Sequence, residues 1–336
     1  MNNTFKEFCQ IDSPSGFETN IRNRILEEIS PFCECSVDNC GNIIAYKKGK
    51  LPSTVRLMLD AHLDEVGIIV SAITPDGFLK FQLLGGIKTS ILLCRKVIIN
   101  DEIVGVIGCK PIHLTEGEEG KKIPPIDALY IDIGCSSRAE AEELVSIGDS
   151  GVLESEFEEL DAEKVKAKAI DDRAGCYVLT NILKQDSDYD FYATFTFGEE
   201  LGCRGAITAT YTVNPEAAIV LEATTAADLD GVSDENKVCT LGEGPAISFM
   251  DNGNLYDRGL FNAAINSGVK CQIKRAVAGA NNSRSIALSR EGVRTLAISV
   301  PCRYIHSPSS ICDTHDIENA ELLAKYMIKK ICSGEI

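Results

Sequence analysis

Residues 55–66 read VRLMLDAHLDEV, and the fold prediction is built outward from this stretch. A short apolar run that ends in polar and charged residues is typical of a strand that is covered on both faces of a sheet. His62 closes the run, and Asp64 follows two residues later. We therefore predict a buried strand over residues 55–61 with a histidine at its carboxyl end.

The rest of the chain alternates between strand-like and helix-like segments, apart from one long interruption. Helical spacing runs through residues 5–29 with a pause at residues 13–16, and residues 33–47 are strand-like. After residue 164 the pattern predicts helices over residues 171–185, 203–211, 259–268, 283–292 and 320–332, and strands over 192–197, 217–223 and 295–300. Such alternation predicts an α/β fold, in which a mixed, largely parallel sheet is flanked by helices on both faces.

The interruption runs from Gly67 to Glu163 and has a different sequence pattern. Its apolar runs are short, are separated by Gly, Pro and Asp-Gly, and include few helical stretches, which is typical of a β-rich unit. We predict a catalytic domain made of residues 1–66 and 164–336, with a β-barrel-like domain inserted at residues 67–163. Within the insertion, the charged segment EGEEGKK at residues 116–122 predicts a solvated loop.

Composition restricts the partners and the compartment. The formal net charge of −17 argues against nucleic acid and anionic membranes, because both require a basic face. We see neither an apolar run of ~18 residues nor a basic and then apolar signal segment at the start. The 14 cysteines are scattered, mostly through apolar stretches, which predicts reduced thiols in a cytoplasmic protein. The group Cys33, Cys35 and Cys40 matches no zinc-binding spacing that we trust.

Acidic residues follow several of the expected strands. Asp171-Asp172 follow AKAI, Glu199-Glu200 follow TFTFG, Glu222 follows AIVL, and His306 comes soon after residues 295–300. Ligands in open α/β sheets bind beyond the carboxyl ends of the strands. Histidines and carboxylates together form a nitrogen and oxygen ligand set that suits zinc, cobalt or manganese. Because so many carboxylates in one crevice repel one another without a cation, the pattern predicts a metal site.

An ordered series of blocks along nearly the whole chain resembles the tetrahedral aminopeptidases, which are also called glutamyl aminopeptidases. The blocks are DAHLDEVGIIV (60–70), LLGGIK (83–88), VGVIGCKPIHL (104–114), LYIDIG (129–134), AIDDRAG (169–175), FGEELGCRGA (197–206), LGEGP (241–245) and RYIHSPSS (303–310). The resemblance implies a zinc-peptidase-like catalytic domain that removes the N-terminal residue from short peptides. It also implies a homo-oligomer, either a dimer through residues 67–163 or a dodecamer.

The same resemblance implies two divalent metal ions per subunit, with zinc or cobalt expected, and five protein ligands. His62 and Glu222 would bind one ion, Glu200 and His306 the other, and Asp171, through a cis peptide bond to Asp172, would bridge both. His113 and His315 lack a comparable context, and we interpret them as structural or surface residues.

Two further residues receive catalytic roles from the resemblance. Glu199 would be the general base that acts on a metal-bridged water, which is the nucleophile of this mechanism. Asp64 would orient His62, since metal-bound imidazoles usually require such a partner.

The chain departs from the family pattern in places, and other functions stay open. Glu222 stands where many members have aspartate, Asn281-Asn282 replace a common Thr-Asp or Asn-Asp pair, and Arg284 replaces a small residue, so the specificity is not carried over. The main alternative is a metal-dependent deacylase or carboxypeptidase on the same fold. A glycosidase needs only two carboxylates, but the chain has no tryptophan, which carbohydrate clefts commonly use. A non-catalytic scaffold is the remaining alternative.

Overall fold

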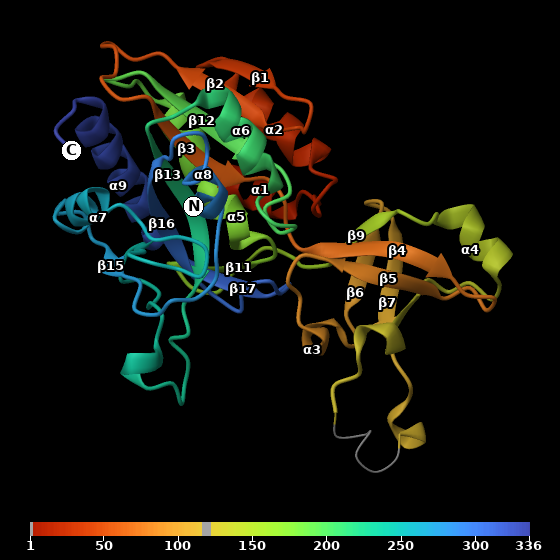
Figure 1. Cartoon of the computed structure of the whole chain (residues 1–336). Coiled ribbons are helices and arrows are strands. Elements are labelled where there is room, and N and C mark those ends of the chain that lie inside the picture. The colour runs from red at the N-terminus through yellow and green to blue at the C-terminus, as the bar shows by residue number, and fades with distance from the viewer. Residues whose placement is uncertain (1–2, 116–121) are drawn as a thin grey trace.

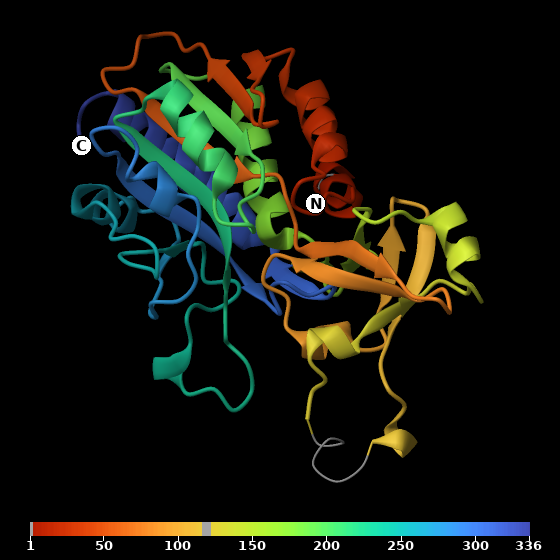
Figure 2. The same ribbon diagram turned by 45° about the vertical axis from the view of Figure 1, so that its right-hand side comes forward.

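The computed structural model describes residues 3–115 and 122–336, which form an α/β part and a β-barrel that projects from it (Figure 1). The view in Figure 2 shows the same two parts, with the barrel beside the lower end of the central sheet. This arrangement confirms the predicted fold class. The domain limits at residues 66 and 164 stay a prediction.

The central sheet has the strand order β1-β2-β12-β3-β13-β16-β17-β11-β10, and the short strands β14 and β15 extend it from β16. Its strands are β1 (Glu34–Val37), β2 (Ile43–Lys47), β3 (Leu57–His62), β10 (Glu158–Glu159), β11 (Lys164–Ala167), β12 (Phe191–Thr196), β13 (Ala217–Thr225), β14 (Ala246–Ile247), β15 (Gln272–Ile273), β16 (Arg294–Arg303) and β17 (Ser310–Asp313). The four central strands β12, β3, β13 and β16 run parallel. Their carboxyl ends therefore meet at one edge of the sheet.

Helices cover both faces of this sheet, and every residue of β3 is buried. The helices of this part are α1 (Asn3–Gln10), α2 (Thr19–Ile29), α5 (Ile170–Lys184), α6 (Arg204–Val213), α7 (Arg258–Ile265), α8 (Ser283–Ile286) and α9 (Thr314–Cys332). Leu57 and Leu59 pack in the large core with α1, α2, α5 and α9, whereas Met58 packs with α6 and α8. Figure 1 shows α6 and α8 in front of the sheet. Because β3 is buried on both faces, its sequence is a continuous apolar run.

The projecting part is a closed antiparallel barrel with the strand order β4-β5-β8-β7-β6-β9. Its elements are β4 (Gly67–Ile73), β5 (Leu79–Leu84), α3 (Thr89–Leu92), β6 (Lys96–Ile99), β7 (Ile103–Gly108), β8 (Tyr130–Asp132), α4 (Arg138–Leu144) and β9 (Ser150–Leu153). It has a hydrophobic core of its own, separate from the core of the α/β part. The charged loop predicted at residues 116–122 lies almost entirely outside the described residues.

Some local predictions were wrong. The helix expected over residues 283–292 is the single turn α8, and the positive φ angles of Arg290 (+51°) and Gly292 (+100°) exclude these two residues from a helix. The sequence analysis also missed α4, β9 and β17. In the described part of the chain, none of the helices combines the length and apolarity needed to cross a lipid bilayer.

Candidate metal centre

Five side chains gather where the parallel strands end. His62 is the last residue of β3, and Glu199-Glu200 follow β12, both as predicted. One predicted position needs correction. Glu222 lies within β13 rather than at its end; because Val220 pairs with Asp60, Glu222 is level with His62. Asp171 follows β11, as predicted, and lies in the first turn of α5, with a cis peptide bond to Asp172.

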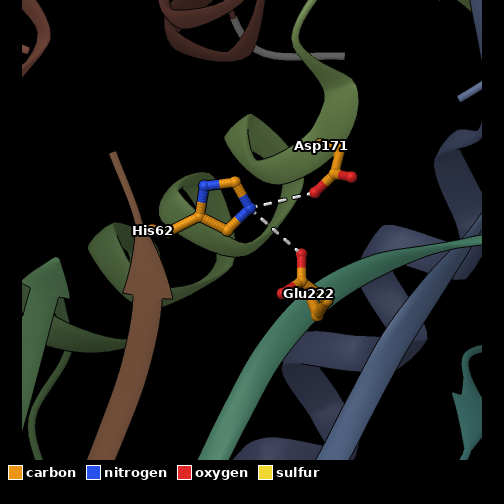
Figure 3. A group of neighbouring side chains, drawn as sticks. All are labelled: His62, Asp171 and Glu222. Carbon is orange, nitrogen blue, oxygen red and sulfur yellow. Dashed lines mark hydrogen bonds and ion pairs between the residues drawn. The ribbon is translucent and has the colours of Figure 1, made fainter. Parts of the chain in front are cut away.

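The first group of candidate ligands is His62, Asp171 and Glu222. Nε2 of His62 lies 3.0 Å from Oδ1 of Asp171 and 3.3 Å from Oε1 of Glu222. The three residues come from β3, α5 and β13, and Figure 3 shows the same ring nitrogen facing both carboxylates. All three side chains are at least 88% shielded from solvent, since the most exposed of them, Asp171, is 12% exposed.

The second group shares Asp171 with the first. Nε2 of His306 lies 3.2 Å from the other carboxylate oxygen of Asp171, Oδ2, and 3.0 Å from Oε1 of Glu200. The ligand atoms within each group all lie within 4.8 Å of one another. Asp171 therefore offers one oxygen to each of two adjacent groups.

These contacts fit a cation better than they fit a hydrogen-bond network. A ring nitrogen carries at most one hydrogen, yet each Nε2 faces two carboxylate oxygens. In the described part of the chain, buried Oε1 of Glu200 has no hydrogen-bond partner despite lying 3.0 Å from His306. Zinc bonds of ≈ 2.0–2.1 Å in tetrahedral geometry separate ligand atoms by about 3.3 Å. The observed separations of 3.0–3.3 Å are close to that value.

Electrostatics favour the same interpretation. Burial raises the pKa of Glu199 to about 8, with the neighbouring carboxylates adding to the rise. Burial and the Asp171 charge raise the pKa of Glu222 well above its ordinary value. Although burial also acts on Asp171, His306 and His62 outweigh it and lower the pKa of Asp171. The site thus concentrates mutually repelling carboxylates, which a bound cation would relieve.

Asp64 contacts both the segment that carries His62 and the segment that carries Glu199 and Glu200. Its carboxylate is fully buried and accepts hydrogen bonds from the backbone amides of Glu199, at 2.9 Å, and Glu200, at 3.0 Å. The Ser15 hydroxyl also donates to it. Nδ1 of His62 lies 3.3 Å from Oδ1 of Asp64. Sequence analysis missed Ser15, which comes from the pause between α1 and α2.

The predicted insertion at residues 67–163 contributes a backbone contact to the site. The carbonyl oxygen of Gly86 lies 3.0 Å from Nδ1 of His306. The preceding Gly85 has a φ of +89°, and a Cβ there would lie 3.1 Å from Oε2 of Glu200. The block LLGGIK was the available signal, because adjacent glycines indicate a close approach of backbone.

A cavity of about 230 Å³ opens beside both ligand groups. Asp171, Glu199, Glu200, Glu222 and His306 line it, and further lining comes from residues 223–225, 278–281 and Lys274. Of the residues that depart from the family pattern, Glu222 and Asn281 lie on the cavity wall. Asn282 is buried between β3 and β12, where it donates to Asp60 and Thr196, and Arg284 lines a separate shallow hollow beside α6.

Comparison with known proteins assigns the chain to a family. The model of the M42 glutamyl aminopeptidase family matches residues 41–323. The lysyl aminopeptidase of Pyrococcus furiosus is 31% identical, in an alignment that covers 96% of this chain and 95% of the relative. This chain belongs to the M42 family. It is therefore a peptide hydrolase of the metal-dependent aminopeptidase class.

Solved structures agree with the M42 assignment. The Pyrococcus horikoshii TET1 peptidase, which can assemble into a tetrahedron or a large octahedral shell, has a TM-score of 0.84 and 31% identity, covering 97% of this chain and 98% of that one. A Thermotoga maritima structure described as an endoglucanase has a TM-score of 0.81 and 34% identity, covering 98% of each chain.

A second place in this M42 chain also brings metal-binding residue types together. Glu163, Asp313 and His315 offer ligand atoms within 4.8 Å of one another. Glu163 and His315 are exposed, and Asp313 accepts the backbone N–H of His315 as the cap of α9. Helix capping accounts for this arrangement of Asp313 and His315, which sequence analysis interpreted as structural or surface.

Proposed function

We propose that the chain is a co-catalytic two-metal aminopeptidase that hydrolyses the N-terminal residue from short peptides. The single observation that carries this proposal is the sharing of Asp171 between two ligand groups. His62 and Glu222 would hold one divalent ion, Glu200 and His306 the other, and Asp171 both. The nitrogen and oxygen ligand set supports zinc or cobalt.

Glu199 is the proposed general base. It lies on the cavity wall beside the ligand groups but belongs to neither of them. Its carboxylate accepts a weak hydrogen bond from the Cys203 thiol, at 3.4 Å, and is therefore available for proton transfer. One Glu199 oxygen would take a proton from the attacking water and then deliver it to the nitrogen of the leaving peptide.

The protein's other contribution is to hold these groups in place. When bound, two divalent cations would lower the pKa of a water molecule, polarise the scissile carbonyl and offer a position for the free α-amine of the substrate. Asp64 would fix the backbone of Glu199 and Glu200 and orient His62, and Gly86 would do the same for the His306 ring. His62, Glu200 and His306 thus each have a further contact that restricts their position.

An assay on matched peptides tests the function. We expect metal-loaded protein to cleave peptides with a free α-amine and to leave the same peptides untouched when they are N-acetylated. Cleavage of the acetylated peptides alone would indicate a deacylase, and release of C-terminal residues would indicate a carboxypeptidase. Hydrolysis of a β-glucan with no peptide cleavage would establish the glycosidase alternative. Inactivity on every substrate would indicate a non-catalytic scaffold.

We also propose that the chain forms a homo-oligomer, either a dimer through residues 67–163 or a dodecamer. The tetrahedral assembly of the Pyrococcus horikoshii relative supports this proposal. So do the apolar side chains that the barrel exposes, with Val104 51% and Ile147 68% exposed. All 14 cysteines lie in the described residues and are free thiols, which supports a reducing, cytoplasmic compartment.

A further inference from the structure

Two cysteine side chains are in contact at an edge of the central sheet. Cys33 precedes β1, Cys35 is the second residue of β1, and their Sγ atoms lie 3.6 Å apart. Side chains two residues apart along an extended chain point to the same face, which accounts for this contact. β1 is the first strand in the order of the sheet and lies at its edge (Figure 1). Both thiols are half-buried, so a small solute can reach the pair.

A buried lysine lies beside this pair. The antiparallel register of β1 and β2 brings Cys33 level with Lys47. Lys47 is 6% exposed, and its Nζ donates to the carbonyl oxygens of Phe32, at 3.2 Å, and Leu183, at 2.8 Å. Within the described part of the chain, this ammonium forms no ion pair with a carboxylate. A buried charge without a counter-ion is costly, and a thiolate at Cys33 would supply the missing negative charge.

The two thiols differ in acidity. The hydrogen bond from Cys33 lowers the pKa of Cys35 to about 7, although burial opposes this change. The same contact and burial raise the pKa of Cys33, while the Lys47 charge acts in the opposite direction. The thiolate is the nucleophile of thiol–disulfide exchange. Cys35 is therefore the better attacking group, and Cys33 is placed to react after it.

We propose that Cys33 and Cys35 form a reversible disulfide by exchange with a low-molecular-weight disulfide. The Cys35 thiolate attacks one sulfur of the external disulfide, which breaks the external S–S bond, releases one thiolate and leaves a mixed disulfide on Cys35. Cys33 then loses its proton and attacks Sγ of Cys35, which forms the Cys33–Cys35 bond and releases the second thiolate. The two cysteines lose two electrons and two protons. The external disulfide gains the two electrons, and its two thiolates take up the protons.

The surroundings of the pair favour this second step. In the mixed disulfide Cys35 carries no charge, so it no longer opposes ionisation of Cys33, whereas Lys47 still favours the Cys33 thiolate. A disulfide bond is ≈ 2.03–2.05 Å long, so the sulfurs must approach by about 1.6 Å from their separation of 3.6 Å. β1 has four residues and pairs with β2 alone, and such short edge elements move at low cost. The site is separate from the metal centre, because none of its three residues lines that cavity.

Peptide mapping by mass spectrometry tests the proposal on the native, full-length protein. After incubation with oxidised glutathione and an acid quench, we expect the Cys33–Cys35 disulfide, and dithiothreitol should restore both thiols. Cys33→Ser should instead retain glutathione on Cys35, because the closing thiol is absent. Cys40→Ser is the matched control, since Cys40 is exposed in the turn between β1 and β2, and it should leave disulfide formation unchanged.

A lysine variant tests the role of the buried charge. Lys47→Met should slow closure of the mixed disulfide about tenfold, which is the effect of one pKa unit on the thiolate population. Lys48→Met is the control, because Lys48 is 71% exposed, and its rate should match the wild type. Equal rates for the two variants would overturn the role of Lys47.

Two results on the wild-type protein would overturn the proposal as a whole. One is glutathione bound at Cys33 or Cys35 with no bond between them. The other is a pair of unmodified thiols there while the exposed Cys94 carries glutathione. The wild-type and Cys33→Ser results decide the question even where circular dichroism shows Lys47→Met to be unfolded.

Discussion

The Asp64 carboxylate accepts a hydrogen bond from the backbone amide of Glu199 at a distance of 2.9 Å. It accepts the next amide, that of Glu200, at 3.0 Å, and it lies 3.3 Å from the His62 ring. One buried side chain thus connects the carboxyl ends of β3 and β12, which carry the proposed base and two of the proposed ligands. Its influence should exceed that of an ordinary buried aspartate.

We expect Asp64→Asn to lower kcat or metal affinity about 10- to 100-fold, because groups that orient metal ligands typically have effects of this size. Ser15→Ala, which removes one donor to Asp64, should have a smaller effect in the same direction. Ser136→Ala is the control, since Ser136 is an exposed residue of the barrel. Steady-state kinetics with metal titration measure both quantities. Full activity and metal content in Asp64→Asn would contradict this role.

The adjacent glutamates should separate proton transfer from metal binding. Glu199→Gln should lower kcat by about 10²–10⁴-fold and retain both metals, because Glu199 belongs to neither ligand group. Glu200→Gln should instead weaken one metal, because it replaces a proposed ligand oxygen. Metal counting by mass spectrometry, with the exposed Glu142→Gln as control, decides between them. Equal metal loss in the two variants would show that the roles are misassigned.

Gly85 offers a test of the contact between the barrel and the site. A Cβ at Gly85 would lie 2.8 Å from Val66 and 3.1 Å from Glu200, so Gly85→Ala should displace Glu200 and lower the occupancy of one metal. Gly134→Ala is a matched control, because Gly134 also has a positive φ, of +83°, but a Cβ there would meet nothing within 4 Å. The control should lose about 1 kcal/mol of unfolding free energy and keep its metals. Equal metal contents in the two variants would contradict the prediction.

Assembly can be tested through the exposed face of the barrel. We expect light scattering to show at least a dimer for metal-loaded protein, and chelation of the metal to shift it toward smaller species. Val104→Asp and Val106→Asp, at residues 51% and 47% exposed, should weaken the assembly because they place charge in an apolar contact. Val37→Asp, 45% exposed in the α/β part, is the control. A stable monomer near 36.4 kDa that still cleaves peptides would contradict the proposal.

The parts of the structure that the sequence predicts well are those with a local signal. The run at residues 55–61 and the helix at residues 171–185 lie within one or two residues of β3 and α5. Short elements such as β17 were missed because a strand of four residues acquires its conformation from pairing with β11 and β16.

The same limit applies to the prediction of the site. The proposed ligands are histidines and carboxylates near expected strand ends, which the sequence reveals, whereas the groups that contact them come together only on folding. Ser15 lies 49 positions from Asp64 and Gly86 lies 220 positions from His306, and no local pattern reports such distances. Lys274 likewise looks like an ordinary surface lysine until its burial is known.

Anomalous diffraction from crystals of metal-loaded protein tests the central claim most directly. We predict two peaks at the site in each chain, with Asp171 contacting both. One peak should also contact His62 and Glu222, and the other Glu200 and His306. A single peak at the site, or peaks only at Glu163, Asp313 and His315, would contradict the two-metal account.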